Sequence, residues 1–450
     1  MRRFFFTIVF FLLFLSANAV YAQPQREARA LRAVDALTES PSVILVEQTT
    51  GRVLYARNER ERRYPANLTN MLTALVAIEH LAPTDEVIIG SEIRGTPAGF
   101  GVNVHSEGEI ITVHTLLNSL LVRSSGEAAR VLALNTMRQT DGRRNIPYEE
   151  AERAFVVLMN EKARSFGTQG SHFASPLGAH SENHFTTAYD LAIITRAFMN
   201  NPILAEIAGT REYNDWTNSN QMLPHAPFGY AYMTGAKAGF TSSAGHVLAG
   251  AAYDAHLGLG FVTIVLGGTD PERWQDTRRL MDHGFNNFRF REIAREGEIL
   301  KTVQIENPRL GDPDTLDIIA SESHTALLGR FEYYEISQII TLNDEQAALR
   351  APIEYGERIG TVSYVLNNEV LFESGIYSQY DVIPRTFDSD MDYYLAAFAE
   401  NVFTRRALPY WFGIFGVAFG VFGIVIAVKA HIRVSRKAVR TLGKSRYSRY

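Results

Sequence analysis

The feature that most constrains this 450-residue chain is a charge-free apolar run close to its C-terminus. Residues 407–428 contain no Asp, Glu, Lys or Arg and are rich in Phe, Gly, Val and Ile. About 20 such residues in helical form are enough to cross the hydrocarbon core of a bilayer. We therefore predict a transmembrane helix at 407–428. A buried core helix is the alternative, and the charge asymmetry of the flanks argues against it.

The segment that follows this run predicts its orientation. Residues 429–450 carry eight Lys or Arg residues and no Asp or Glu. Basic residues concentrate on the cytoplasmic side of membrane helices, so we expect a cytoplasmic tail at 429–450. The bulk of the protein would then lie on the periplasmic, extracytoplasmic side of a bacterial inner membrane. Such a tail can also contact anionic lipid.

The N-terminal sequence predicts export. Arg2 and Arg3 precede an apolar run, and small and polar residues follow it up to Val20-Tyr21-Ala22. A basic start, a short apolar stretch and a small-x-small site are typical of a secretory signal peptide. We predict a signal peptide at 1–22, with an uncleaved anchor as the alternative.

Composition excludes several classes of site and partner. The net charge of −5 gives no reason to expect nucleic-acid binding. The chain has no cysteine, which excludes disulfides, thiolate metal sites and a cysteine nucleophile. Its length predicts two or three domains.

The hydrophobic pattern predicts an α/β (α+β) protein with a smaller β domain after it. Residues 23–292 alternate strand-like and helical segments, and residues 297–384 show short strand patterns separated by turns. Residues 385–406 predict a stalk or juxtamembrane helix. Strands are expected at 42–47, 51–55, 245–252, 258–266, 300–305 and 359–365, and helices from 67 onward, at 116–137 and at 187–198.

Several short motifs occur in a fixed order along the first domain. Pro65-Ala66-Asn67-Leu68-Thr69-Asn70 opens a helical pattern, and Ser124-Ser125-Gly126 and Lys237-Ala238-Gly239 follow at long intervals. The stretches 172–178, 183–190 and 217–220 lie between them. In order and spacing this set resembles the serine D-alanyl-D-alanine carboxypeptidases, the low-molecular-weight penicillin-binding proteins. The resemblance implies a β-lactamase/transpeptidase-like domain with a central antiparallel sheet flanked by helices, followed by a β domain.

The first motif differs from that of the family at the two positions that carry out the reaction. The family sequence is Pro-Ala-Ser-x-Thr-Lys, and here Asn67 stands for the serine and Asn70 for the lysine. Serine acyl transfer needs an activated hydroxyl and a base, and a carboxamide supplies neither. Losing both members of a cooperating pair should remove the covalent pathway. In the plainest interpretation Asn67 only caps the following helix at the surface.

The other two motifs are also incomplete. The family's Ser-x-Asn falls on Ser124-Ser125-Gly126, or on Ser125-Gly126-Glu127 with an offset of one residue, and either way the amide is missing. The family's Lys-Thr-Gly is Lys237-Ala238-Gly239. Lys237 would still offer a cation to a substrate carboxylate and Gly239 would still allow close approach, although an exposed strand lysine needs no functional explanation. The substrate-binding candidates are Ser124, Ser125, Lys237, Ala238 and Gly239.

Two further sites are considered and disfavoured. The resemblance places Ser124 near Lys237, but nothing in the sequence directs Ser124 at a scissile bond. His172, His180 and His184 match no standard metal-binding spacing. We therefore predict neither a metal nor a cofactor.

The favoured function is that of a non-catalytic homologue, a pseudoenzyme, that binds peptidoglycan stem peptides or cell-wall proteins. The alternative is an active D-alanyl-D-alanine carboxypeptidase with a rearranged nucleophile. A third hypothesis is a structural or signalling membrane protein whose cytoplasmic tail is the working part.

Overall fold

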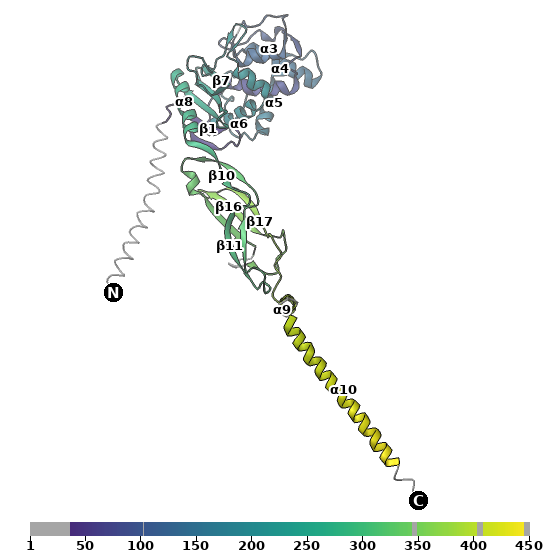
Figure 1. Cartoon of the computed structure of the whole chain (residues 1–450). Helices are drawn as coiled ribbons and strands as arrows, with labels where there is room; N and C mark the ends of the chain where they lie inside the picture. The colour runs from purple at the N-terminus through teal and green to yellow at the C-terminus, as the bar shows by residue number, and fades with distance from the viewer. Residues whose placement is uncertain (1–36, 102, 344–348, 403–407, 445–450) are drawn as a thin grey trace, which may run out of the picture. The chain divides into compact units, whose positions relative to one another are not determined.

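The computed structural model describes residues 37–101, 103–343, 349–402 and 408–444 (Figure 1). The signal peptide predicted at 1–22 lies outside the described residues. The chain forms two compact units. The first runs to Phe290 and includes Leu327–Arg330, and the second comprises Arg291–Ala326 and the chain from Phe331 onward.

An antiparallel sheet of five strands organises the first unit, in the order β2-β1-β9-β8-β7. This confirms the sheet that the family resemblance implied. The central strands are buried on both faces, which explains their unbroken apolar sequence. The strands are β1 (Ser42–Glu47), β2 (Val53–Arg57), β7 (Met233–Thr241), β8 (Gly245–Asp254) and β9 (Leu259–Gly268).

Helices cover both faces of this sheet and create two separate apolar cores. The larger core joins the sheet to α2 (Thr69–His80), α3 (Val113–Leu121), α4 (Gly126–Asp141), α5 (Tyr148–Ser165), α6 (Ala188–Met199) and α7 (Pro202–Gly209). The smaller core joins the sheet to α8 (Asp270–Asn287), which contributes Trp274, Leu280, Met281 and Phe285. The helix predicted at 187–198 is confirmed as α6.

The single helix predicted at 116–137 is wrong, because the structure has two helices there. α3 ends at Leu121 and α4 begins at Gly126. Ser125 caps α4 by accepting a hydrogen bond from the Ala128 N–H, and Ser124 has a φ of +63°, which no helix interior contains. The Ser-Ser-Gly sequence therefore favours a cap and a turn over a continuous helix.

The predicted role of Asn67 as a surface helix cap is also wrong. A short 3₁₀ turn, η1 (Ala66–Leu68), precedes α2, and the N-cap position of α2 is Leu68. Asn67 is the middle residue of η1 and is only 7% exposed. The remaining short elements of this unit are η2 (Ser91–Ile93), β3 (Glu86–Ile88), β4 (Ile110–Thr112), β5 (Glu212–Tyr213) and β6 (Trp216–Thr217).

The second unit is built mainly of short strands, as the sequence predicts. Two three-stranded sheets have the orders β12-β11-β15 and β14-β16-β17. Strands expected at 300–305 and 359–365 are confirmed as β11 and β16. The elements that follow α8 in the chain are β10 (Phe288–Ala294), β11 (Ile299–Glu306), β12 (Thr315–Ile319), β13 (His324–Gly329), η3 (Glu332–Glu335), β14 (Ser337–Leu342), β15 (Leu349–Arg350), β16 (Arg358–Leu366) and β17 (Glu369–Tyr377).

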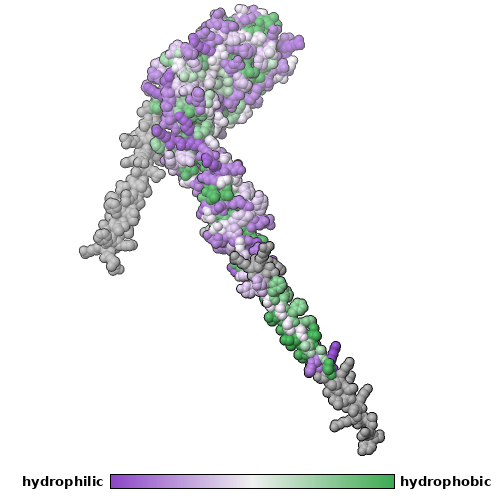
Figure 2. Space-filling view, viewed as in Figure 1, coloured by the Kyte–Doolittle hydropathy of each residue, from purple (hydrophilic) through white to green (hydrophobic). Residues whose placement is uncertain are grey.

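Two helices complete the described chain, α9 (Phe387–Val402) and α10 (Leu408–Lys444). Within α10, Pro409–Val434 is long and apolar enough to cross a membrane, and none of its side chains is buried (Figure 2). This is compatible with the membrane anchor predicted at 407–428. The helix does not end there, because it continues through the first part of the basic segment as far as Lys444.

Candidate functional site

Asn67 lies against the edge strand β7. A Cβ atom added to Gly239 would lie 2.9 Å from the Asn67 backbone nitrogen, so a side chain at position 239 would collide with η1. On its other side η1 contacts Gly178, where an added Cβ would lie 2.0 Å from the Ala66 carbonyl oxygen. Ala66 itself has a φ of +48°. Two glycines thus let the motif at 65–70 fit tightly between neighbouring segments.

Asn70 lies one helical turn after Asn67 and is 1% exposed. Its Nδ2 donates a long hydrogen bond of 3.5 Å to the Leu177 carbonyl oxygen. Its Oδ1 has no hydrogen-bond partner within the described residues. The side chain is thus a poorly satisfied buried amide, and it cannot accept a proton from a nucleophile.

Lys237 projects from β7 and is 0% exposed, so the interpretation of an exposed strand lysine is wrong. Its Nζ donates hydrogen bonds to the Leu121 carbonyl oxygen at 2.8 Å, to Ser219 Oγ at 2.9 Å and to Ser124 Oγ. No ion pair in the described part of the chain includes it. Burial therefore lowers the pKa of the Lys237 ammonium to about 7.

Ser124 occupies the turn between α3 and α4 and is half-buried. The turn is held in place because the Ser125 N–H donates to the Ser119 carbonyl oxygen at 3.0 Å and the Gly126 N–H donates to the Phe100 carbonyl oxygen. The structure thus brings together Ser124 and Lys237, as the family resemblance implied. Ser125 is oriented differently, since its hydroxyl caps α4 and donates to the Gly101 carbonyl oxygen.

Gly126 has no room for the amide side chain of the family motif. An added Cβ would lie 2.7 Å from the Phe100 carbonyl oxygen and 3.0 Å from Leu177 Cδ2. The loop that carries Phe100 is fixed by Glu127. Its carboxylate accepts hydrogen bonds from the N–H groups of residues 103, 104 and 105 at 2.8–3.0 Å. The space of the missing amide is therefore filled.

Ser219 is a site residue that sequence reasoning did not single out. Its N–H donates to the Val122 carbonyl oxygen at 3.1 Å, which fixes it beside the α3–α4 turn. Its neighbours Asn218 and Asn220 are buried and bond backbone carbonyls of Thr210 and Gly235. The only signal was its place in the stretch 217–220, which resembles the family without stating a role.

The remaining predicted positions have clear structural surroundings. Ala238 is 3% exposed and belongs to the smaller core. His184 is buried, and its Nδ1 accepts from the Ala174 N–H while its Nε2 lies 3.0 Å from Thr69 Oγ1. Burial lowers the pKa of His184 to about 4. Across the described residues, no group of three or more metal-ligating side chains is arranged to hold a metal ion.

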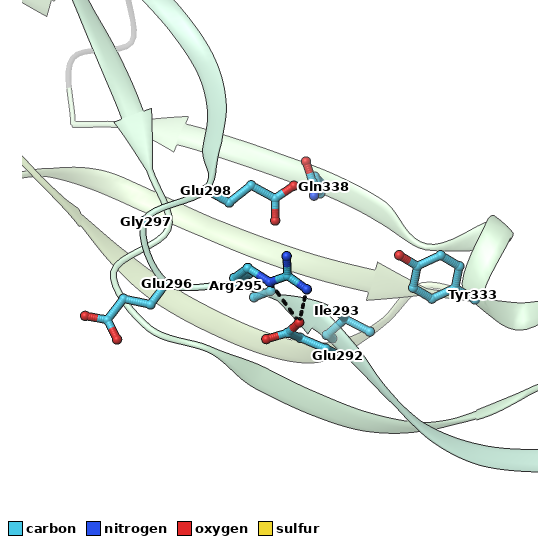
Figure 3. A pocket seen from close by; sticks show the side chains of 9 residues that line it. Glu292, Ile293, Arg295, Glu296, Gly297, Glu298, Tyr333 and Gln338 are labelled. Carbon is cyan, nitrogen blue, oxygen red and sulfur yellow. Dashed lines mark hydrogen bonds and ion pairs between the residues drawn. The ribbon is translucent and has the colours of Figure 1, made fainter.

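A polar pocket of about 570 Å³ lies in the second unit (Figure 3). Arg295 forms an ion pair with Glu292 at 2.8 Å inside it, and Glu298, Tyr333 and Gln338 also line it. None of the predicted site residues lines this pocket. It is separate from the Ser124–Lys237–Ser219 cluster.

Two protein families match the chain. Residues 29–269 match the family described as D-alanyl-D-alanine carboxypeptidase. Residues 288–383 match the family described as penicillin-binding protein 5, C-terminal domain.

Curated relatives and solved structures agree with these matches. The chain is 26% identical over 359 residues to the D-alanyl-D-alanine carboxypeptidase DacF of Bacillus subtilis, covering 76% of this chain and 86% of the relative. It is 27% identical over 333 residues to DacD of Escherichia coli, covering 71% and 81%. Penicillin-binding protein 5 from Haemophilus influenzae shares the fold with a TM-score of 0.56 at 24% identity, covering 76% of this chain and 97% of that one.

Proposed function

Because this chain belongs to the D-alanyl-D-alanine carboxypeptidase family, we propose that it is a member inactive as a peptidase, which binds peptidoglycan stem peptides or cell-wall proteins without cleaving them. The observation that carries the proposal is the pair of buried carboxamides, Asn67 and Asn70, at the positions of the nucleophile and its base. A carboxamide neither attacks a carbonyl carbon nor accepts the nucleophile's proton.

The proposal also assigns a place in the cell. The protein is exported and held in the inner membrane by α10, with its two units on the periplasmic side and the tail in the cytoplasm. The apolar span Pro409–Val434 and the basic residues after it support this topology. Peptidoglycan peptides are within reach of a protein placed in this way.

The experiment uses the full-length protein in detergent and a pentapeptide that ends in D-Ala-D-Ala. We expect calorimetric titration to detect peptide binding and an assay for free D-alanine to detect no release. Lys237→Met should weaken binding, because it removes the hydrogen bonds that hold Ser124 and Ser219 beside β7. Release of D-alanine by the wild-type protein would overturn the proposal, as would the absence of any binding.

One contact favours a second candidate, a carboxypeptidase with a rearranged nucleophile. Lys237 Nζ donates a hydrogen bond to Ser124 Oγ. A hydroxyl and an amine are therefore in contact, although the serine and lysine of the family's first motif are replaced by Asn67 and Asn70. In the same assay, release of D-alanine that Ser124→Ala abolishes would establish this candidate in place of the first.

A further inference from the structure

The hydrogen bonds around Lys237 define where its protons can go. Leu121 contributes a carbonyl oxygen, which only accepts, whereas Ser124 and Ser219 contribute hydroxyls that can accept or donate. A protonated amine can donate to all three oxygens. A neutral amine has two N–H groups and one lone pair, so with Leu121 and one serine as acceptors, the other serine must donate its proton to the amine.

Ser124 is the serine better placed to act as a nucleophile. Its φ of +63° is uncommon for a residue with a side chain, and such conformations concentrate at functional sites. The turn packs closely against Gly101, where an added Cβ would lie 3.0 Å from the Ser124 carbonyl oxygen. The residue is half-buried, and α4 begins two positions later, so that helix N-terminus favours negative charge nearby.

The charged side chains next to this turn do not neutralise Lys237. Arg123 is exposed, and the carboxylate of Glu127 is engaged by backbone N–H groups of the loop at 103–105. The amine is therefore surrounded by neutral oxygens. This environment favours its uncharged form, which is the form that can act as a base.

We propose that Ser124 is a nucleophile and Lys237 its general base, forming a reactive centre that hydrolyses carboxylic esters. Ser124 Oγ bonds to the ester carbonyl carbon as its proton moves to Lys237 Nζ. The bond to the alcohol oxygen breaks, and the alcohol leaves with that proton. Water then attacks the acyl-serine, again giving its proton to Lys237, and the acid departs as Ser124 recovers its proton.

The chemistry of the leaving group explains the choice of esters. A peptide nitrogen must be protonated before it leaves, whereas an alcohol oxygen departs more readily. Esters are therefore the more reactive acyl substrates for a centre of this kind. This activity goes beyond the proposed function and does not depend on it. Ser219 is a positioning residue, because it holds one N–H of the amine and leaves the lone pair for Ser124.

The test is reaction of the full-length protein with a fluorophosphonate, whose phosphorus is attacked by an activated serine as fluoride leaves. We expect an adduct that peptide mass spectrometry places on Ser124. Its rate of formation should rise with pH to a plateau, with a midpoint near 7. Ser124→Ala should abolish the adduct, and Lys237→Met should slow its formation by about a hundredfold or more.

Matched variants keep the test decisive. Ser165→Ala removes an exposed hydroxyl at the end of α5 and should leave the rate unchanged. Ser124→Gly suits a positive φ and should fold even if Ser124→Ala does not. Ser219→Ala should shift the pH midpoint, which a purely structural residue would not do. Absence of an adduct on Ser124, or a rate unaffected by Lys237→Met in a folded protein, would overturn the proposal. D-alanine release tests the proposed function, and the adduct on Ser124 tests the esterase proposal. The failure of one can therefore be distinguished from the failure of the other.

Discussion

A buried amine without a carboxylate partner makes stability depend on pH. The ordinary pKa of lysine is 10.5, and in the folded protein the pKa of Lys237 is about 7. Between these values the unfolded chain binds a proton that the folded chain does not, so stability rises as the pH rises through this window. Below pH 7 both states are protonated, and the full cost of burying the charge remains.

Lys237→Met should therefore stabilise the protein at pH 7, by a few kcal/mol on the scale of about 1.4 kcal/mol per pKa unit. The measurement is chemical unfolding of the wild-type and variant proteins from pH 6 to 10. The difference between their free energies of unfolding should become smaller as the pH rises. Parallel profiles would show that the amine is not buried as described.

His184 gives the corresponding effect in acid. Its pKa is about 4 in the folded protein against an ordinary 6.5, so the unfolded chain binds more protons between these values. Stability should fall as the pH drops from 6.5 to 4. His184→Gln, which cannot be protonated, should flatten this part of the profile. An equally steep acid limb in the variant would assign the effect to other groups.

At the scale of elements, the N-terminus of α4 packs closely against the loop that carries Phe100, and this contact leaves no room for a side chain at Gly126. Restoring the family amide by Gly126→Asn should destabilise the protein by about 1–3 kcal/mol, because overpacking forces neighbours to shift. The control is Gly142→Asn at the other end of α4. There an added Cβ meets nothing within 4 Å, and Asn tolerates the φ of +71°. Thermal unfolding should separate the two variants clearly.

Elements were predictable where one local signal dominated. Apolar runs predicted β1, β8 and β9, because buried central strands need them. The break between α3 and α4 was missed because apolar spacing continues across it, while capping and a positive φ decide the structure. The site was predicted in part, because the resemblance named Ser124 and Lys237 but not the burial of the amine or its bond to Ser219. Lys237, Ser124 and Ser219 come from three distant segments, and only the tertiary fold shows that the lysine is buried among them.

At the scale of the whole molecule, the family framework is retained around an altered centre. The double variant Asn67→Ser plus Asn70→Lys returns the nucleophile and its base. We expect fluorescent penicillin to label this variant on residue 67. Release of D-alanine should stay low, because position 126 still lacks its amide. Full turnover by the double variant would show that the loss at 126 has no functional effect.

The anchor allows an independent test of the proposed topology. The chain from Phe387 onward contains α9 and α10, and the apolar span lies within the latter. Truncation after Thr386 should move the protein from the membrane fraction to the soluble periplasmic fraction. The full-length protein should resist extraction at high pH. Retention of the truncated protein in the membrane would point to a second attachment.

The packing of Phe100 against Gly126 also limits how this protein can evolve. A mutation that restores asparagine at 126 meets an occupied space, so it is harmful until the loop at 95–101 has changed. A change in that loop alone brings no benefit, because there is no amide for it to accommodate. Neither change is therefore favourable on its own, and single substitutions do not readily lead to the carboxypeptidase reaction of the family.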